Sequence, residues 1–481
     1  MKLRDFTEIL SFYSKFIRRS FTFKTTIMKI PLTIMLMFCI TKMHSQEPVV
    51  GKEIVFTPVN VIPMDKEEVL TNQTVVVKNG VIIEMGDAAS VKYNKKATVI
   101  DAKGKYLVPG LAEMHAHVPT NADEQAHKDV VKLFALHGIT TIRGMLGHPS
   151  HIALREKLRT GEILGPILYT SGPAVSGGSV KSPEQAVALV KEEKKAGYDF
   201  LKILPGLTKE NFAVVAKTAK EEEIRFAGHI SFDVGVWNSI NAEYQTIDHM
   251  DGFVEGLVPG VENMTEKETG FFGMNVARQA DQSKIPVLMA ELKKHNVWVV
   301  PTQALAERWI SSERSAETLR AAPEMKYMDA KTLDAWVKTK SSMKKNPSYD
   351  SAKIIDYIAL RRKLIFAINQ SGVGLLLGCD APQVFNVPGV ATHHELKYLV
   401  DAGLTPYEAL KTGTVNVAKF YKKEGKAGVV RKGAASELIL LNANPLEDIS
   451  NSRKIEGVML RDKWLSKSYI ERSLKQLEKT N

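Results

Sequence analysis

Cysteine is scarce in this sequence, and no apolar run is long enough to cross a membrane. The 481 residues include two cysteines, Cys39 and Cys379, and Cys39 falls within a predicted N-terminal targeting segment. Removal of that segment leaves one cysteine, which excludes an intramolecular disulfide in the mature chain. The apolar stretch from Ile30 to Ile40 is shorter than the roughly 20 residues that a transmembrane helix needs. We therefore expect no stable membrane span in the mature chain.

The sequence also lacks a basic stripe, internal repeats and low-complexity segments. Its formal net charge is +11, but residues 1–45 hold eight Lys or Arg residues against Asp5 and Glu8, a net +6 that leaves +5 for the remainder. No segment interleaves basic with aromatic residues, as nucleic-acid binding would favour, so we predict no nucleic-acid partner. With 44% hydrophobic and 25% charged residues, the composition is that of an ordinary globular protein with more than one domain.

Residues 28–45 have the three zones of a secretory signal peptide. Met28-Lys29 supplies the basic start, Ile30 to Ile40 the apolar core, and Thr41 to Ser45 the short segment before cleavage after Ser45. Residues 1–27 are either an unusually long lead or precede the true start at Met28, the interpretation that we favour. We predict that residues 1–45 are a leader and that the protein is exported, to the periplasm or outside the cell.

Both ends of the remaining chain have the pattern of short strands and turns. Within residues 49–108, the stretch from Thr74 to Gly86 contains two strand-like runs joined by Asn79-Gly80, the strongest short signal for a hairpin. Strand-like runs return in residues 425–465, where Ala427 to Val430 is one of them. We predict that these two regions form one small β-sandwich and that a C-terminal helix covers residues 466–481.

Between these regions, residues 109–424 alternate strand and helix patterns, which is typical of a parallel α/β fold. Eight apolar runs are candidate strands: Leu107 to His115, Ile139 to Arg143, Ile167 to Ser171, Phe200 to Leu204, Arg225 to His229, Thr246 to His249, Trp298 to Pro301 and Leu375 to Asp380. Eight such strands predict the α/β fold class and a (β/α)8 TIM-type barrel.

Two helix starts are clear, because Ser182-Pro183 and Thr405-Pro406 each place a capping residue before proline, with Gln or Glu two residues further on. The interval 303–369 is too long for one crossover, and its charged, helix-favouring composition predicts a helical insertion near the barrel mouth.

A possible metal site begins in the segment from Pro109 to His117, which ends in His-x-His. Side chains alternate along a strand, so His115 and His117 point the same way and can share one metal ion. Such a pair alone is more often a chance surface feature. Later apolar runs also end on or contain a metal-competent or titratable group: Lys202, His229, His249 and Asp380. The carboxyl ends of buried parallel strands are where a barrel carries its active site.

Seven motifs contain or accompany these residues: PGLAEMHAH, YDFLKI, GHIS, IDHMD, GCDAP, HHELKYLVDAGLTPYEAL and LILLNANPLEDI. Together they resemble the amidohydrolase superfamily, in its imidazolonepropionase-like and prolidase-like branch, over nearly all of residues 49–479. The resemblance implies a barrel with a one- or two-metal site and a small β-sandwich made from both chain ends.

The resemblance also implies a role for each candidate. His115, His117 and Asp380 would bind a first metal, His229 and His249 a second, and Lys202 would react with carbon dioxide to form a carbamate that bridges both. An ammonium has no lone pair with which to ligate a metal. Such donors suit two zinc ions, with manganese, iron or cobalt left open. The alternatives are an ion pair for Lys202, a core role for His229, and helix capping for His249 and Asp380.

Four further residues are candidates for substrate binding at the barrel mouth: Arg143, Tyr169, Gln303 and His393. Two positions depart from the family pattern. Gly144 follows Arg143 where aspartate is usual, and Phe232 stands where prolidase-like members often have a tyrosine that contacts a substrate carboxylate.

The predicted function is metal-dependent hydrolysis of a C–N bond in a small substrate such as a dipeptide or N-acyl amino acid. Two cations about 3.5–4 Å apart hold a bridging hydroxide and polarise a carbonyl oxygen. Asp380 would accept the proton of that hydroxide and pass it to the departing nitrogen. A lactonase or phosphotriesterase-type hydrolase of C–O or P–O bonds and a non-catalytic binding protein stay open as alternatives, as does a homo-oligomer.

Overall fold

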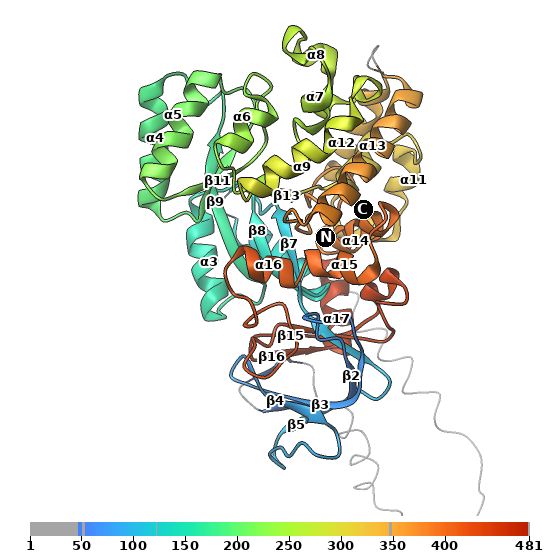
Figure 1. The fold of residues 1–481 in the computed structure, drawn as a ribbon. Coiled ribbons are helices and arrows are strands. Elements are labelled where there is room, and N and C mark those ends of the chain that lie inside the picture. Colours follow the sequence, from blue (N-terminus) through green and yellow to red (C-terminus); the bar gives the residue numbers. More distant parts are fainter. Residues whose placement is uncertain (1–46, 51–52, 122, 346–348, 480–481) are drawn as a thin grey trace, which may run out of the picture. The chain divides into compact units, whose positions relative to one another are not determined.

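The computed structural model describes residues 47–50, 53–121, 123–345 and 349–479 (Figure 1). These residues belong to one compact unit. The predicted leader and signal peptide, residues 1–45, lie outside the described residues. No helix in the described ranges combines the length and the apolar character that crossing a membrane requires.

In the described part of the chain, seven parallel strands form the barrel wall, and each is hydrogen-bonded to the next in chain order. They are β7 (Leu111–Ala116), β8 (Ile139–Gly144), β9 (Ile167–Val175), β10 (Phe200–Ile203), β11 (Arg225–Gly228), β12 (Thr246–Asp248) and β13 (Trp298–Val300). Most of their residues are buried, as expected of parallel strands that are covered on both faces. Seven of the predicted barrel strands are therefore present, with two larger differences in their bounds. Leu107 to Pro109 belong to a strand of the other sheet rather than to β7, and β9 continues four residues beyond the predicted end at Ser171.

The eighth predicted strand, Leu375 to Asp380, closes the barrel without a regular ladder. It bonds to both neighbouring strands through two backbone pairs: Leu376 N to Val299 O at 2.9 Å and Met114 N to Leu377 O at 2.8 Å. Further along, the Glu113 carboxylate accepts the Cys379 N–H at 2.8 Å in place of a strand carbonyl. The segment thus occupies the eighth position, and the fold is a (β/α)8 TIM-type barrel.

Helices pack around the barrel strands (Figure 1). Those outside the long insertion are α2 (Glu124–Leu136), α3 (Ser150–Thr160), α4 (Pro183–Ala196), α5 (Lys209–Glu221), α6 (Gly235–Asn241), α7 (Phe253–Leu257), α8 (Glu266–Thr269), α9 (Ile285–Lys294), α14 (Val390–Asp401), α15 (Pro406–Thr412) and α16 (Val415–Phe420). Both predicted helix starts are confirmed: the Ser182 side chain caps α4, and Thr405 and Glu408 form a reciprocal capping box on α15.

Two connections carry additional helices. Between α7 and α9 the chain forms η1 (Val261–Asn263), α8, η2 (Phe271–Gly273), η3 (Ala277–Gln279) and η4 (Gln282–Lys284). After β13 it forms α10 (Gln303–Leu305), η5 (Ala306–Ile310), α11 (Ala316–Arg320), η6 (Pro323–Tyr327), α12 (Ala330–Lys344) and α13 (Ser351–Ser371). The second group lies in the interval for which the sequence predicts a helical insertion.

A mixed sheet built from both chain ends adjoins the barrel. Its strands are β1 (Val49–Val50), β2 (Ile54–Val61), β3 (Leu70–Lys78), β4 (Val81–Asp87), β5 (Thr98–Asp101), β6 (Tyr106–Pro109), β14 (Leu438–Leu441), β15 (Ile455–Leu460) and β16 (Lys463–Ser466), with η7 (Ile449–Arg453) and α17 (Lys467–Leu477) beside them. The hairpin is confirmed, since Lys78 pairs with Val81 around Asn79 and Gly80, which both have positive φ. Ala427 to Val430 is not a strand, so that prediction is wrong.

Strand β14 joins the sheet to the barrel. Alternate side chains of a strand point to opposite faces. Leu438 and Leu440 lie in the apolar core of the sheet, and Ile439 and Leu441 lie in the core that surrounds the barrel. The antiparallel pairing of β14 with β6, which directly precedes β7, thus anchors the first barrel strand.

Candidate metal centre

Three predicted ligands lie together at the carboxyl end of the barrel. His115 is on β7, His117 follows that strand, and Asp380 ends the eighth segment. One ligand atom of each lies within 4.8 Å of the other two. His117 Nε2 is 2.7 Å from Asp380 Oδ1, and His115 Nε2 is 3.7 Å from the same oxygen. Two imidazoles and a carboxylate at this spacing have the donor atoms that a divalent transition metal prefers.

His229 and His249 extend this cluster, and each follows its strand by one residue. The His249 ring centroid lies 4.4 Å from the His115 ring and 4.4 Å from the His229 ring. His249 Nδ1 is 3.9 Å from Asp380 Oδ2. The structure therefore brings all five predicted imidazole and carboxylate ligands to one end of the barrel.

Three of these histidines are held by an oxygen atom beside Nδ1. The pairs are His115 with Asp248 Oδ2 at 3.0 Å, His229 with Asp251 Oδ2 at 2.9 Å and His249 with Thr302 Oγ1 at 2.9 Å, the last two being hydrogen bonds. Metal-binding histidines have such a partner on the ring nitrogen that does not face the metal. The Nε2 atom of each ring is left available, and that of His249 is buried without a hydrogen-bond partner.

Lys202 lies on β10 and is only 1% exposed. Its Nζ has no hydrogen-bond partner among the described residues. Burial lowers the pKa of the Lys202 ammonium to about 8, and Asp248 and Asp380 oppose that shift. An unpaired buried amine that loses its proton readily is able to react with carbon dioxide, so Lys202 fits the predicted carbamate.

Burial and neighbouring charges set protonation states that suit metal binding. Burial and the Lys202 charge lower the pKa of His115 to about 4, and burial lowers the pKa of His249 well below its ordinary value. Burial opposes ionisation of Asp248, but the Arg143 guanidinium and His115 hold its pKa at about 2. Likewise, His115 and His117 outweigh burial and lower the pKa of Asp380. The imidazoles of His115 and His249 are thus neutral and the carboxylates charged near pH 7.

The backbone is strained where the ligands leave the strands. His249, Thr302 and Asp380 have φ of 63°, 45° and 62°, a region that non-glycine residues rarely adopt. Such conformations cost of order 1–3 kcal/mol each and cluster at functional sites. The strain supports a functional role for this end of the barrel.

Two of the four candidate substrate-binding residues lie near the cluster. Arg143 is buried, donates to Thr246 Oγ1 at 2.6 Å and lies 3.6 Å from Asp248 Oδ2. Gln303 is also buried, and its Oε1 accepts a hydrogen bond from Arg361. Both side chains contact residues that support the cluster.

The other two candidates lie elsewhere. The Tyr169 ring stacks on Tyr421, and its hydroxyl accepts a hydrogen bond from Lys423 beside a small hollow at the amino ends of the strands. His393 hydrogen-bonds through both ring nitrogens, to Ser452 Oγ and to the carbonyl of His137. The structure therefore does not bring Tyr169 or His393 to the metal-ligand cluster.

Sequence reasoning missed several residues that support the site. Asp248 and Asp251 flank His249 in the motif IDHMD, so this motif contained the signal for them. Glu113 accepts four hydrogen bonds, from His115 N, Cys379 N, Cys379 Sγ and Thr392 Oγ1. Arg361 of α13 donates to the carbonyls of His249 and Pro301 at 2.6 Å each. No local pattern marks Arg361, because three of its four partners, His249, Pro301 and Gln303, lie more than 50 residues away.

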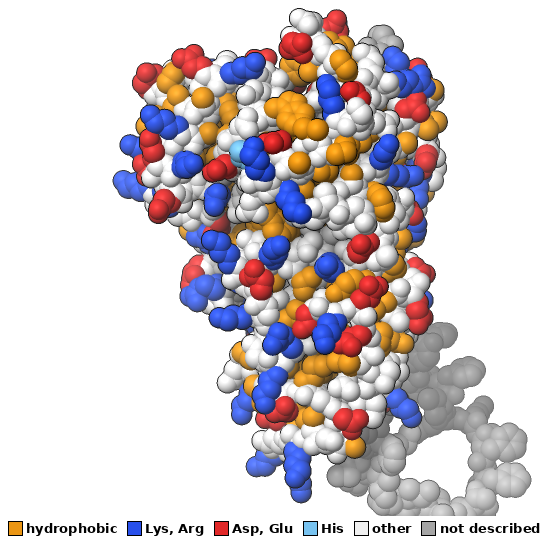
Figure 2. Space-filling model, viewed as in Figure 1, with side chains coloured by type: hydrophobic (Ala, Val, Ile, Leu, Met, Phe, Trp, Pro, Cys, Tyr) orange, Lys and Arg blue, Asp and Glu red, His pale blue; other side chains and the backbone are white. Residues whose placement is uncertain are grey.

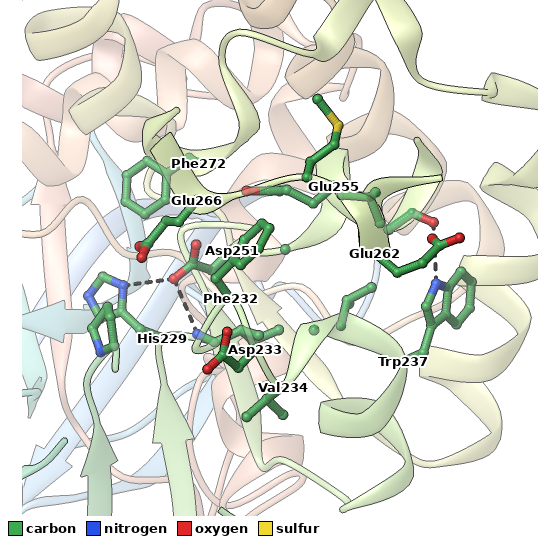
Figure 3. Close-up of a pocket in the computed structure, with 18 of the residues that line it drawn as sticks. His229, Phe232, Asp233, Val234, Trp237, Asp251, Glu255, Glu262, Glu266 and Phe272 are labelled. Atoms are coloured by element: carbon green, nitrogen blue, oxygen red, sulfur yellow. Dashed lines mark hydrogen bonds and ion pairs between the residues drawn. The ribbon is translucent and has the colours of Figure 1, made fainter. Parts of the chain in front are cut away.

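A cavity of about 750 Å³ opens beside the cluster. Figure 3 shows His229 at one end of it, hydrogen-bonded to Asp251, and Trp237 at the other. Pockets of about 300–1,000 Å³ are typical of small-molecule sites. The cavity therefore has the size and the position of a substrate site.

The fold and the site place the chain in the class of (β/α)8-barrel enzymes. The model of the amidohydrolase family matches residues 106–465, so the chain belongs to that family and is a hydrolase acting on carbon–nitrogen bonds. The chain is 23% identical to ochratoxinase from Aspergillus niger over 415 residues, which cover 81% of each protein.

Solved structures support the fold. A putative prolidase from Bifidobacterium longum matches with a TM-score of 0.62 and 20% identity, over 89% of this chain and 100% of that one. A bottromycin amidohydrolase matches with a TM-score of 0.66 and 19% identity, over 88% of this chain and 89% of that one.

Proposed function

We propose that the enzyme binds two divalent metal ions, best supplied as zinc, and hydrolyses the amide or peptide-type bond of a small substrate. His115, His117 and Asp380 would hold one ion, His229 and His249 the other. The observation that carries this proposal is the cluster itself, in which the ligand atoms of His115, His117 and Asp380 lie within 4.8 Å of one another.

Three buried nitrogen and oxygen atoms of the site are consistent with bound cations. Lys202 Nζ, His249 Nε2 and Asp380 Oδ1 are buried without hydrogen-bond partners. Leaving such groups unpaired costs of order 1–3 kcal/mol each. Cation ligation, together with carbamate formation on Lys202, would satisfy all three.

Side chains of the site would transfer the proton and orient the metal-binding histidines. A bound divalent pair supplies an activated water and polarises the substrate carbonyl. Asp380 is charged and lies beside His117, so it is placed to accept the proton of that water and to deliver it to the leaving nitrogen. Asp248 and Asp251 hold two of the imidazoles in orientation.

We propose a dipeptide or an N-acyl amino acid as substrate. The similar proteins include a prolidase and an amidohydrolase by name, which favours a peptide-type bond. The cavity of about 750 Å³ is large enough for a ligand of that size.

Metal content per chain is the experiment that tests the centre. Protein purified without chelators or added metal should hold about two ions per chain, and a Lys202→Ala variant one or none. Formate, a carboxylate of the shape of the missing carbamate, should restore the second ion to the variant. One ion in both proteins would refute the bridging role of Lys202.

Carbon NMR gives an independent measurement. Protein equilibrated with ¹³C-bicarbonate should show a carbamate carbon signal that Lys202→Ala lacks. A Lys209→Ala variant, which changes an exposed lysine outside the cluster, should keep the signal.

We also propose that residues 28–45 direct export. The N-terminus of the mature protein, read by mass spectrometry from the cell envelope or culture medium, should begin at Gln46. An intact N-terminus in the cytoplasmic fraction would contradict export.

A further inference from the structure

The cavity beside His229 is rich in carboxylates. Its lining includes six acidic residues, Glu210, Asp233, Asp251, Glu255, Glu262 and Glu266, and one lysine, Lys209. Asp251 binds His229, and none of the other five forms an ion pair with any described residue. Figure 3 shows the carboxylates of Asp251 and Glu266 turned toward the His229 end.

Glu255 differs from the exposed acids because its position is fixed. Its Oε2 is buried without a hydrogen-bond partner. The segment above it approaches closely, since a Cβ on Gly273 would lie 2.8 Å from that oxygen. Burial and the neighbouring Asp251 charge raise the pKa of Glu255 to about 8, so without a partner its carboxyl group is mostly protonated near pH 7. A cation bound beside Oε2 would favour the ionised form and pair with it.

The rest of the wall is apolar. Phe232, Trp237, Phe271 and Phe272 line the cavity together with aliphatic side chains such as Val234 and Met264. Apolar walls bind the stem of a long side chain, and aromatic faces attract its cationic end.

On the face that Figure 2 shows, the Lys and Arg side chains are dispersed. Blue and red side chains alternate over the face in Figure 2, without a broad surface of one sign. The acidic residues of the cavity come mainly from the segments that follow β11 and β12, and Glu210 comes from α5 after β10.

We propose that the cavity selects substrates that carry a positive charge at the end of an apolar stem, such as the side chain of a lysine or arginine residue. The proposal rests on the proposed hydrolysis of a peptide-type bond at the adjoining centre. Glu255 and Glu266 would pair with the cation, and the aromatic residues would pack along the stem.

The same lining disfavours an anionic group. Phe232 offers neither a charge nor a hydroxyl to a substrate carboxylate, and the exposed Lys209 is the single lysine or arginine of the cavity wall. A carboxylate that entered the cavity would meet Glu255 and Glu266 and would lose its hydration without a partner.

Rates on matched dipeptides test the proposal. The metal-loaded enzyme would be assayed on Lys-Ala, Met-Ala and Glu-Ala and on the reversed set Ala-Lys, Ala-Met and Ala-Glu. In the set that the enzyme prefers, we expect kcat/KM to be at least tenfold higher for the lysine peptide than for the methionine peptide, and lowest for the glutamate peptide. Methionine matches the length of the lysine stem without its charge.

Variants that replace a glutamate of the cavity with neutral glutamine test whether the cavity causes the selectivity. Glu266→Gln changes an exposed side chain and should retain the fold, and Glu255→Gln keeps the shape of a half-buried side chain. Each should lower the lysine-to-methionine ratio by about tenfold, the effect of about 1.4 kcal/mol. Glu192→Gln, an exposed change on α4 outside the cavity, should leave the ratio unchanged.

A binding measurement separates failure of this proposal from failure of the proposed function. Calorimetry with pentylamine and its neutral counterpart 1-pentanol reports on the cavity without hydrolysis. Amine binding that weakens in Glu266→Gln, with no hydrolysis of any peptide, would refute the proposed function and support the cation site. Hydrolysis that favours the glutamate peptides would overturn the cation site. A lysine-to-methionine ratio of kcat/KM that is unchanged in both Glu255→Gln and Glu266→Gln would also overturn it.

Discussion

Gly228 is the residue whose replacement best tests how the site is built. It ends β11 directly before His229, with φ of +122°, a conformation that side-chain-bearing residues rarely adopt. A Cβ at this position would lie 2.5 Å from the Ile203 carbonyl oxygen and 2.9 Å from Lys202 Cδ. Gly228→Ala should lower the free energy of unfolding by about 1–3 kcal/mol through backbone strain and by about 1–3 kcal/mol through overpacking. The total loss of stability is about 2–6 kcal/mol.

The control for this variant is Gly197→Ala. Gly197 also has positive φ, +85°, but a Cβ there has no atom within 4 Å. Gly197→Ala should therefore lower the free energy of unfolding by about 1 kcal/mol, through backbone strain alone. Urea unfolding should therefore give a much lower midpoint for Gly228→Ala than for Gly197→Ala, and metal analysis should show fewer ions per chain only in Gly228→Ala. Equal midpoints with unchanged metal content would refute this explanation of the glycine.

Three further changes have definite expectations. Asp251→Asn should weaken metal binding about 10–100-fold in chelator competition, because it alters the group that orients His229, and the circular dichroism spectrum should not change. Arg361→Met should lower the free energy of unfolding by about 3 kcal/mol or more in urea, because buried acceptors that include the His249 carbonyl lose their donor. Burial raises the pKa of Glu193 to about 8, so the folded state binds an extra proton between about pH 4.5 and 8 and stability falls as pH rises through that range. Glu193→Gln should remove this slope and stabilise the protein at pH 8 by on the order of 3 kcal/mol, measured by urea unfolding at several pH values.

The fold was predictable because its strands and turns have strong local signals. Apolar runs of strand length alternate with helix patterns, and Asn79-Gly80 demands the positive φ values of a tight hairpin turn. The ladder of the eighth strand was not predictable, because the Glu113 side chain takes the place of a backbone acceptor there. Ala427 to Val430 has the composition of a strand, but Val430 N bonds to the carbonyl of Pro63 rather than to a neighbouring strand.

The metal-ligand cluster was predictable to the extent that it depends on position along a strand. His115 and Asp380 close their runs, and parallel strands bring such positions to one end of the barrel. Tyr169 shows where this reasoning fails. It was expected near the end of a strand that stops at Ser171, but β9 continues to Val175, so Tyr169 is only its third residue and lies at the amino end.

The support of the site could not be predicted from local patterns, because it depends on tertiary contacts. Arg361 comes from α13 and binds the carbonyl of His249, 112 residues earlier in the chain. A helix far away in the chain therefore holds the backbone of His249, a predicted ligand with positive φ. A buried guanidinium is costly unless its donors are paired, and here it donates to two main-chain carbonyls, a glutamine oxygen and a tyrosine hydroxyl. Helix α13 is consequently part of the scaffold that holds His249 in place.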